Sequence, residues 1–392
     1  MKKFLIIIAV TASSSIFAQN SIDNALISVE RNNTALKAIR EDIEAQKIEN
    51  KTGIYLPNPE LEFNYLWGSP GNIGNRNDIN ISQTFDFPTV AGMKRKISDK
   101  RNNLLELRYR AEKLDILLQA RQYCIDLIRC NAMKQELEQR LKHAAALAEG
   151  YKKRLDSGDA NILEYNKAQL NLAMAKGEAA NMETERKSVA AELKRLNGGL
   201  DITVNDTEYG NVILPDNFDE WFARAEQSNP VLEYVKQEVE IAKSEISLNK
   251  AMLLPNISAG FMREKVVGET YQGISVSLSI PLWANKNKVK QAKAALKADE
   301  AKQADSRLQF YEYLKSMYNK SKDLQLIAEE YRQTLLSLNS AVLLTKALDA
   351  GEISLLDYIV ELGLYYNTVD LKLNAEREFQ KAFAELLKTA GN

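Results

Sequence analysis

Two stretches of this chain alternate between apolar and polar residues, and each leads directly into a long segment of helical composition. From Ile274 to Ile280 every second residue is apolar, and serines stand between the apolar positions. A similar stretch runs from Ile79 to Phe87. Because successive side chains of a β-strand point to opposite faces, both stretches predict a strand with one apolar face and one polar face.

A proline ends each of these two predicted strands. Pro88 follows the first and Pro281 the second, and no proline occurs between Pro88 and Pro215 or after Pro281. Both proline-free segments are rich in Ala, Lys, Glu, Leu and Gln, which favour helices. The pattern therefore predicts a strand that runs into a long helix, at two places in the chain.

The order of these features indicates an internal duplication. The triplet Leu-Pro-Asn at 56–58 recurs at 254–256. The segment 156–165 (DSGDANILEY) matches 349–358 (DAGEISLLDY) at an offset of 193 residues, which is also the offset between the two prolines. Residues 19–199 are predicted to form the first repeat, 200–215 a linker segment, and 216–392 the second repeat.

Both repeats are predicted to contain a hairpin, a long helix and a return helix. In the first repeat an opening helix at about 22–52 precedes strands at about 59–67 and 77–87, a long helix at about 88–155 and a return helix at about 161–196. The second has strands at about 256–264 and 271–280, a long helix at about 282–348 and a return helix at about 353–388. Gly158 and Gly351 are expected to end the long helices.

The long helices are too long to be buried in one globule. A helix of about 65 residues extends about 100 Å, so these helices must pack side by side along their length. A coiled-coil seam with alternating spacings of four and three residues is formed by Leu137, Leu141, Ala144, Ala148, Tyr151 and Leu155.

The first 18 residues have the pattern of a secretory signal peptide. Lys2 and Lys3 precede an apolar run from Phe4 to Val10, and small residues lead to a predicted cleavage after Ala18. A membrane anchor is the alternative, but the apolar run is far shorter than the roughly 20 residues that span a bilayer.

Composition excludes several classes of function. The chain has 52 Lys and Arg against 53 Asp and Glu, which argues against a nucleic-acid binder with a basic surface. The single histidine, His143, is expected at the surface, so a His-based triad or metal site lacks its residues. Cys124 and Cys130 lie six residues apart in a predicted helix, too far for a disulfide, and are expected to be buried. We expect no enzyme, cofactor or bound metal.

The polar strand faces fit either of two surroundings. In a soluble sandwich the apolar face would meet a second sheet, whereas in a membrane barrel it meets lipid and the polar face lines a lumen. The signal peptide, the strand lengths and the aromatic residues near the strand ends favour the barrel. The side chains then expected to face the lumen are Asn80, Ser82, Thr84, Ser275, Ser277 and Ser279. Those expected to face lipid are Ile79, Ile81, Phe85, Ile274, Val276 and Leu278.

The duplicated order of helix, hairpin, long helix, glycine turn and return helix resembles the TolC family of outer-membrane efflux proteins. The motifs that carry the resemblance are Leu-Pro-Asn before each hairpin, a closing proline, and SGDANILEY and AGEISLLDY at the helical turns. The resemblance implies an α+β membrane protein that forms a homotrimer, with a 12-stranded β-barrel in the outer membrane and a coiled-coil tunnel in the periplasm. It also implies a passive exit duct that works with a periplasmic adaptor and an inner-membrane pump of the RND type. The size of the chain favours the heavy-metal branch of the family.

The glycine turns are the expected tip of the tunnel. The resemblance makes Asp357 the main candidate for a periplasmic gate, together with Asp156 and Asp349, although Val360 stands where the family often has a second aspartate. Solvated helix ends are the competing role for Asp159 and Glu352. Gly158, Gly351, Leu163 and Leu356 are candidates for the adaptor contact, with burial between helices as the alternative for the leucines.

Two other classes of protein stay open at this point. A soluble periplasmic coiled-coil adaptor or scaffold would use the serine-faced strands in a sandwich. An enzyme would need a pair of carboxylates such as Asp156 and Asp159, which lie at a helix turn where caps are the simpler explanation.

Overall fold

The computed structural model describes residues 21–283, 285–337 and 340–390. These residues fall into two compact units, and we describe each by itself. The strand unit comprises Ala38–Ala111 and Pro230–Phe310. The helical unit comprises the described residues of Met1–Lys37, Glu112–Asn229 and Tyr311–Asn392. Each unit therefore takes segments from both repeats.

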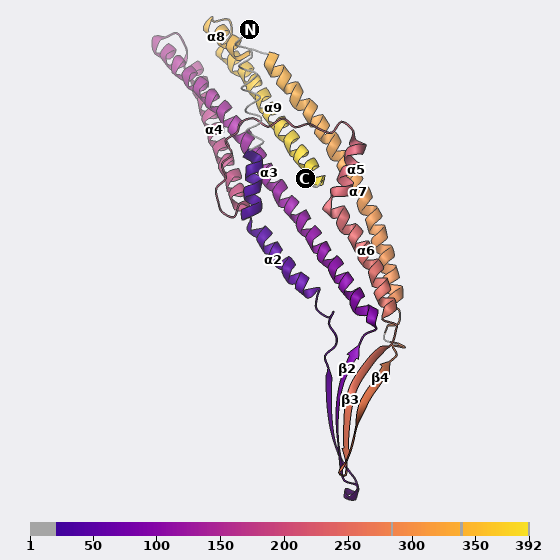
Figure 1. The fold of residues 1–392 in the computed structure, drawn as a ribbon. Coiled ribbons are helices and arrows are strands. Elements are labelled where there is room, and N and C mark those ends of the chain that lie inside the picture. The colour runs from indigo at the N-terminus through magenta and orange to yellow at the C-terminus, as the bar shows by residue number, and fades with distance from the viewer. Residues whose placement is uncertain (1–20, 284, 338–339, 391–392) are drawn as a thin grey trace. The chain divides into compact units, whose positions relative to one another are not determined.

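The two predicted hairpins come together in one sheet. The first hairpin consists of β1 (Glu60–Trp67) and β2 (Asn75–Phe85), and the second of β3 (Asn256–Val266) and β4 (Glu269–Ser279). All neighbours are antiparallel, in the order β1-β2-β3-β4 (Figure 1). The expected combination of four strands with long helices is confirmed.

The first repeat contains the longest helix of the described chain. α3 (Pro88–Ser157) is one unbroken helix of 70 residues, about 105 Å long at 1.5 Å per residue. After the turn at Gly158, α4 (Ile162–Leu196) follows. α2 (Thr34–Glu49) precedes the first hairpin.

The second repeat has the same order of elements. α5 (Phe218–Ser228) and α6 (Pro230–Ala251) precede its hairpin. α7 (Lys288–Ser337), α8 (Ser340–Asp349) and α9 (Leu355–Thr389) follow the hairpin. Within the described residues, no helix is both long enough and apolar enough to span a bilayer.

A buried asparagine interrupts the opening helix that the sequence predicts as continuous. Residues 21–32 are helical, and α2 starts after Asn33, whose Oδ1 accepts a hydrogen bond from the N–H of Leu36 at 2.9 Å. Its amide nitrogen donates to the carbonyl of Leu196 at 2.7 Å. In the second repeat Asn229 donates in the same way to the carbonyl of Thr389 at 2.9 Å. The duplication thus extends to individual hydrogen bonds.

The long helix of the second repeat begins later than predicted. The expected start was residue 282, but α7 starts at Lys288. Asn287 has a φ of 69°, a left-handed conformation that an L-residue helix does not contain. Asn285 is buried, and its amide nitrogen donates to the carbonyl of Met252 at 2.5 Å. These two asparagines hold residues 285–287 in a turn.

One apolar core of the helical unit surrounds the middle of α3. Ile125 and Ile128 of α3 pack with Val29 of the first helical segment and Leu193 of α4. Cys124 belongs to this core and Cys130 is also buried, and neither forms a disulfide, as expected. Cys130 lies beside the polar residues described next.

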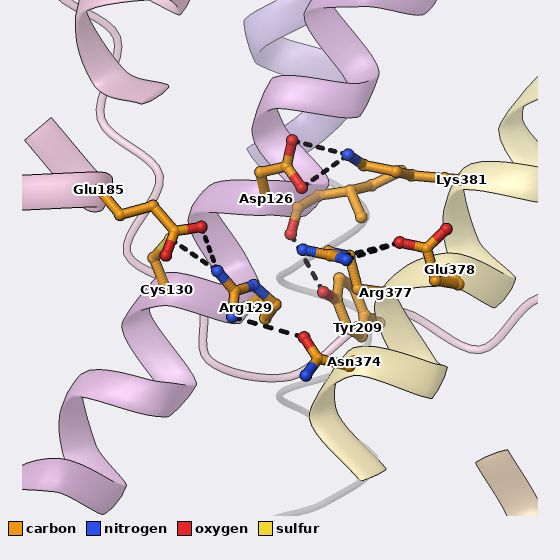
Figure 2. Close-up of polar contacts among 10 residues, drawn as sticks. Asp126, Arg129, Cys130, Glu185, Tyr209, Asn374, Arg377, Glu378 and Lys381 are labelled. Carbon is orange, nitrogen blue, oxygen red and sulfur yellow. Dashed lines mark hydrogen bonds and ion pairs between the residues drawn. The ribbon is translucent and has the colours of Figure 1, made fainter. Parts of the chain in front are cut away.

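A polar cluster links three helices near this core (Figure 2). The Arg129 side chain of α3 is only 7% exposed; it forms an ion pair with Glu185 of α4 and donates to Asn374 of α9 at 3.5 Å. Lys381 of α9 pairs with Asp126 of α3 at 2.7 Å. These contacts tie the second repeat to the first within the helical unit.

The linker packs against the same core although it forms neither helix nor strand. Val204 is buried, and the hydroxyl of Tyr209 donates to the carbonyl of Ile125 at 3.0 Å. Burial raises the pKa of Tyr209 far above its ordinary value. The linker is therefore a fixed part of the helical unit.

Candidate functional site

The register places all six candidate lumen residues on one face of the sheet. Thr84 of β2 stands opposite Ser258 of β3, which stands opposite Ser277 of β4. The hydroxyls of Thr84 and Ser258 lie 2.9 Å apart. The other members of this face that the sequence pointed to are Asn80, Ser82, Ser275 and Ser279. The two repeats thus contribute to one continuous polar surface.

The polar face also carries charged residues that the sequence reasoning did not select. Glu60 of β1 stands opposite Ser82, and Glu62 stands opposite Asn80. Their alternation with Leu61 and Phe63 was the signal that could have identified them. The face is therefore acidic as well as hydroxyl-bearing.

An arginine partly neutralises this acidic face. Arg76 of β2 contacts Asp78 at 2.9 Å and Glu264 of β3 at 3.2 Å. The carboxylates of Glu60 and Glu62 are exposed on the same face. An acidic surface of this kind attracts cations.

The opposite face of the sheet is apolar and uncovered. Trp67 is 80% exposed, Ile274 84% and Leu61 73%. The described strands form a single sheet, so no second sheet of the described chain packs against these residues. Exposed apolar surfaces of this size mark contact with lipid or with another protein. The described strands do not form the sandwich expected for a soluble adaptor.

The two edge strands carry unpaired backbone groups. β1 pairs only with β2, and β4 pairs only with β3. Each edge therefore has a row of N–H and C=O groups without a partner strand in the described chain. Such edges are very costly in lipid unless another strand covers them.

Both glycine turns end their helices with the same hydrogen bonds. Gly158 has a φ of 84° and Gly351 a φ of 73°, which favour glycine. The N–H of Asp159 donates to the carbonyl of Arg154 at 2.7 Å, and the N–H of Glu352 donates to that of Ala347 at 2.9 Å. This is the Schellman arrangement at the end of a helix.

A capping box opens the helix after each turn. Asn161 accepts from the N–H of Glu164 at 3.0 Å, and Glu164 accepts in return from the N–H of Asn161 at 3.0 Å. Ser354 accepts from the N–H of Asp357 at 3.1 Å, while Asp357 accepts from the Ser354 hydroxyl at 2.6 Å. Within a single chain, the Asp357 carboxylate therefore helps to cap the start of α9.

The other candidate residues of the turns are exposed. Asp156 and Asp349 lie at the surface, and Asp159 accepts from the hydroxyl of Ser157 at 2.7 Å. Leu163 is 67% and Leu356 50% exposed, so neither is buried between helices of the same chain. These leucines are available for contact with another chain.

A buried arginine in the second half of α3 was not identified from the sequence. The side chain of Arg140 on α3 is 6% exposed and bonds to Asp370 of α9 at 2.5 and 3.2 Å. Its guanidinium lies 4.5 Å from the ring centroid of Tyr366, whose hydroxyl is 3.1 Å from Nδ1 of the exposed His143. A hollow of about 310 Å³ adjoins these side chains. No local pattern distinguishes Arg140 from the exposed arginines of the same helix.

The described residues contain no cluster of three or more His, Cys, Asp or Glu side chains placed to hold a metal ion. The candidate site is the exposed surface of the sheet and of the two glycine turns. Its features are a polar sheet face, an apolar sheet face, two open edges and a pair of exposed turns.

Residues 221–392 match the family model described as outer membrane efflux protein. The matched segment covers nearly all of the second repeat. A search of curated protein sequences finds no match.

Several solved structures have the same fold over most of the chain. A membrane protein from Pseudomonas aeruginosa superposes with a TM-score of 0.79 at 15% identity, covering 94% of this chain and 93% of its own. The CmeC outer membrane channel of Campylobacter jejuni gives a TM-score of 0.71 at 15% identity, covering 95% and 85%. The outer membrane protein VceC of Vibrio cholerae gives 0.74 at 13% identity, covering 95% and 96%.

Proposed function

We propose that this chain is an outer-membrane efflux protein of the TolC family and that three copies of it assemble into a passive exit duct. It is a channel of the outer membrane with its helices in the periplasm, and it is not an enzyme. The proposed duct carries substrates that an inner-membrane pump delivers, because the chain has no energy-coupling motif of its own.

The observation that carries the proposal is the four-stranded sheet with one apolar face and two open edges. Four strands are too few to close a membrane barrel, and the smallest such barrels have about eight strands. Pairing β1 of one copy with β4 of the next would satisfy both edges. Three copies would give 12 strands, with the polar faces inward and the apolar faces toward lipid.

The assembly is tested by the native mass of the detergent-solubilised protein. Three protomers are expected. A mass of one protomer would contradict the proposal, since a single sheet cannot stand open in a bilayer.

The orientation of the sheet is tested with single cysteines at matched positions. We expect Ser277→Cys, on the polar face, to react with a water-soluble maleimide in intact outer membranes. Val276→Cys, its neighbour on the apolar face, should react poorly. Equal labelling of both positions would contradict the proposed lumen.

We propose that the glycine turns form the periplasmic tip and that Asp357 contributes to its gate. α3 carries the chain about 105 Å from Pro88 before Gly158 reverses it, which places the turn far along the tunnel. Because Asp357 also caps α9, the test needs two variants. Asp357→Asn removes the charge, whereas Ser354→Ala removes the cap and keeps the charge.

In planar bilayers, we expect Asp357→Asn to lower the preference for cations and Ser354→Ala to leave that preference unchanged. Asp156→Asn and Asp349→Asn, at the exposed ends of the preceding helices, should have smaller effects. If Asp357→Asn has the conductance and ion preference of the wild type, Asp357 is not part of the gate.

We propose a periplasmic adaptor and an RND-type pump as partners, with Leu163 and Leu356 in the adaptor contact. Their exposure beside the turns supports this assignment. Leu163→Ser and Leu356→Ser should weaken binding of the adaptor encoded beside this chain, and the matched change Leu170→Ser, farther along α4, should not. Equal effects of all three substitutions would contradict the assignment of Leu163 and Leu356 to the adaptor contact.

We further propose that the chain belongs to the heavy-metal branch, on the basis of its compact size. Deletion of the gene for this chain should then lower the resistance of the cells to copper or silver ions more than their resistance to organic drugs. The opposite order would assign it to a drug-efflux branch.

A further inference from the structure

Within the helical unit, α9 covers a specific face of the first repeat. Leu355, at the start of α9, is 3% exposed and packs with Ala148, Tyr151 and Ala168. Farther along, other residues of α9 pack with α3 in a second cluster, made of Met133, Leu137, Val369 and Leu373. We call this contact the intrachain joint.

The equivalent face of the second repeat is open. The offset of 193 residues places Leu326 of α7 where Met133 stands in α3, yet Leu326 is 63% exposed and Met133 only 5%. Glu330 takes the place of Leu137, and it is also exposed. The second repeat thus presents the surface that the first repeat hides.

A hollow marks the position that Leu355 fills in the intrachain joint. It measures about 370 Å³, and its lining includes Leu344 of α8 and Glu361 and Tyr365 of α9. These three residues are the counterparts of Tyr151, Ala168 and Leu172, which pack around Leu355 in the first repeat. The hollow is therefore the second copy of the Leu355 site.

The complementary surface lies uncovered on α4. Ile162 is the counterpart of Leu355 and is 54% exposed. Lys176 and Ala180, the counterparts of Val369 and Leu373, are exposed as well. One chain therefore has both halves of a second joint, and both are uncovered.

We propose that Ile162 of one copy enters the hollow between α8 and α9 of the next copy, with Lys176 forming an ion pair with Glu330. The charges support this pairing. Glu330 stands where Leu137 stands in the intrachain joint, and Lys176 stands where Val369 stands, so an acidic residue would face a basic one in place of the apolar contact. Among the residues that the structure describes, neither Lys176 nor Glu330 makes an ion pair. In such a head-to-tail contact each copy offers one half of the joint to one neighbour and the other half to the other neighbour, as the closed ring of the proposed trimer requires.

The inference rests on the trimer proposed above and adds the residues that join its periplasmic helices. Cross-linking tests the first contact. The variant with both Ile162→Cys and Leu344→Cys is treated with a short bis-maleimide in membranes. We expect denaturing gels to show covalent dimers and trimers, and each single variant to show monomers. The native cysteines are buried and give little background.

Charge reversal tests the second contact. Lys176→Glu and Glu330→Lys should each speed the exchange of subunits between labelled trimers by about threefold or more, the range of an exposed ion pair. The double variant should return the rate to within about twofold of the wild type. Lys167→Glu is the matched control. The residue equivalent to Lys167 in the second repeat is Val360, which is exposed and takes no part in the intrachain joint.

The outcomes separate this inference from the proposed function. A monomeric mass in detergent would overturn both. A trimer that gives no 162–344 cross-link, and in which both reversals behave like Lys167→Glu, would overturn the joint and leave the proposed duct intact.

Discussion

Asn161 and Ser354 occupy equivalent positions 193 residues apart, and each accepts a hydrogen bond from the backbone N–H three residues later. The two side chains differ, yet both open a helix directly after a glycine turn. The turn geometry is therefore specified separately in each repeat by local polar contacts.

Removing one of these caps should loosen its turn. We expect Ser354→Ala to destabilise the start of α9 by about 1 kcal/mol, because the N–H of Asp357 loses its acceptor. Hydrogen exchange of the first turn of α9 measures the effect. Ser354→Asp, which keeps an acceptor, should restore protection, and unchanged exchange in Ser354→Ala would contradict the prediction.

Breaking the buried ion pair of Arg140 should lower the free energy of unfolding more than the loss of a helix cap does. Asp370→Leu leaves the buried guanidinium uncompensated, and we expect a loss of about 2–3 kcal/mol, below the range for a fully buried pair because Asp370 is partly exposed. Thermal unfolding in detergent measures this loss.

A second substitution identifies the cause. Adding Arg140→Met should recover most of the stability, since no charge then stays buried. Glu149→Leu, which breaks an exposed pair with Lys153, is the control and should leave the melting temperature close to that of the wild type. Equal effects of Asp370→Leu and Glu149→Leu would contradict the prediction.

The native thiols should be inert in the folded chain. Burial raises the pKa of Cys124 to about 12 and that of Cys130 to about 11, so few thiolates exist at pH 8. We expect iodoacetamide to modify neither cysteine at pH 8 unless the chain is unfolded. Leu163→Cys, at an exposed position, should react in the folded protein and serves as the positive control. Rapid modification of Cys124 without denaturant would show that the core opens.

The ion pair on α4 should give a stability contribution that depends on acid pH. Hydrogen bonds from Arg186 lower the pKa of Glu183 from 4.5 to about 2. Because the pKa is lowered on folding, the contribution is complete above pH 4.5 and is lost as the pH falls toward 2.

The comparison of the wild type with Glu183→Gln measures this contribution. The pair is partly exposed, so we expect an advantage of only about 0.5 kcal/mol for the wild type at neutral pH. The difference in melting temperature should shrink below pH 4.5. A difference in melting temperature that grows as the pH falls would contradict the prediction.

The sequence predicted features that depend on local patterns. Alternation along Ile79–Phe87 and Ile274–Ile280 identified the strands and assigned their faces, because the side-chain period of a strand is a property of each strand alone. Glycine and helix-forming residues located the turns and the long helices in the same way. The break at Asn33 was missed, because it depends on a hydrogen bond to Leu196 from a distant part of the chain.

The sequence by itself determined which residues share a strand face, where the helices turn, and that the chain is built twice. Only the tertiary structure decided that both hairpins join in one sheet, that Thr84 meets Ser258, that Arg140 is buried against Asp370, and that Asp357 bonds to Ser354. The physical reason is the distance along the chain over which each effect acts. Periodicity and turn chemistry act within a few residues, whereas register, burial and the partner of a charge depend on which distant segments pack together.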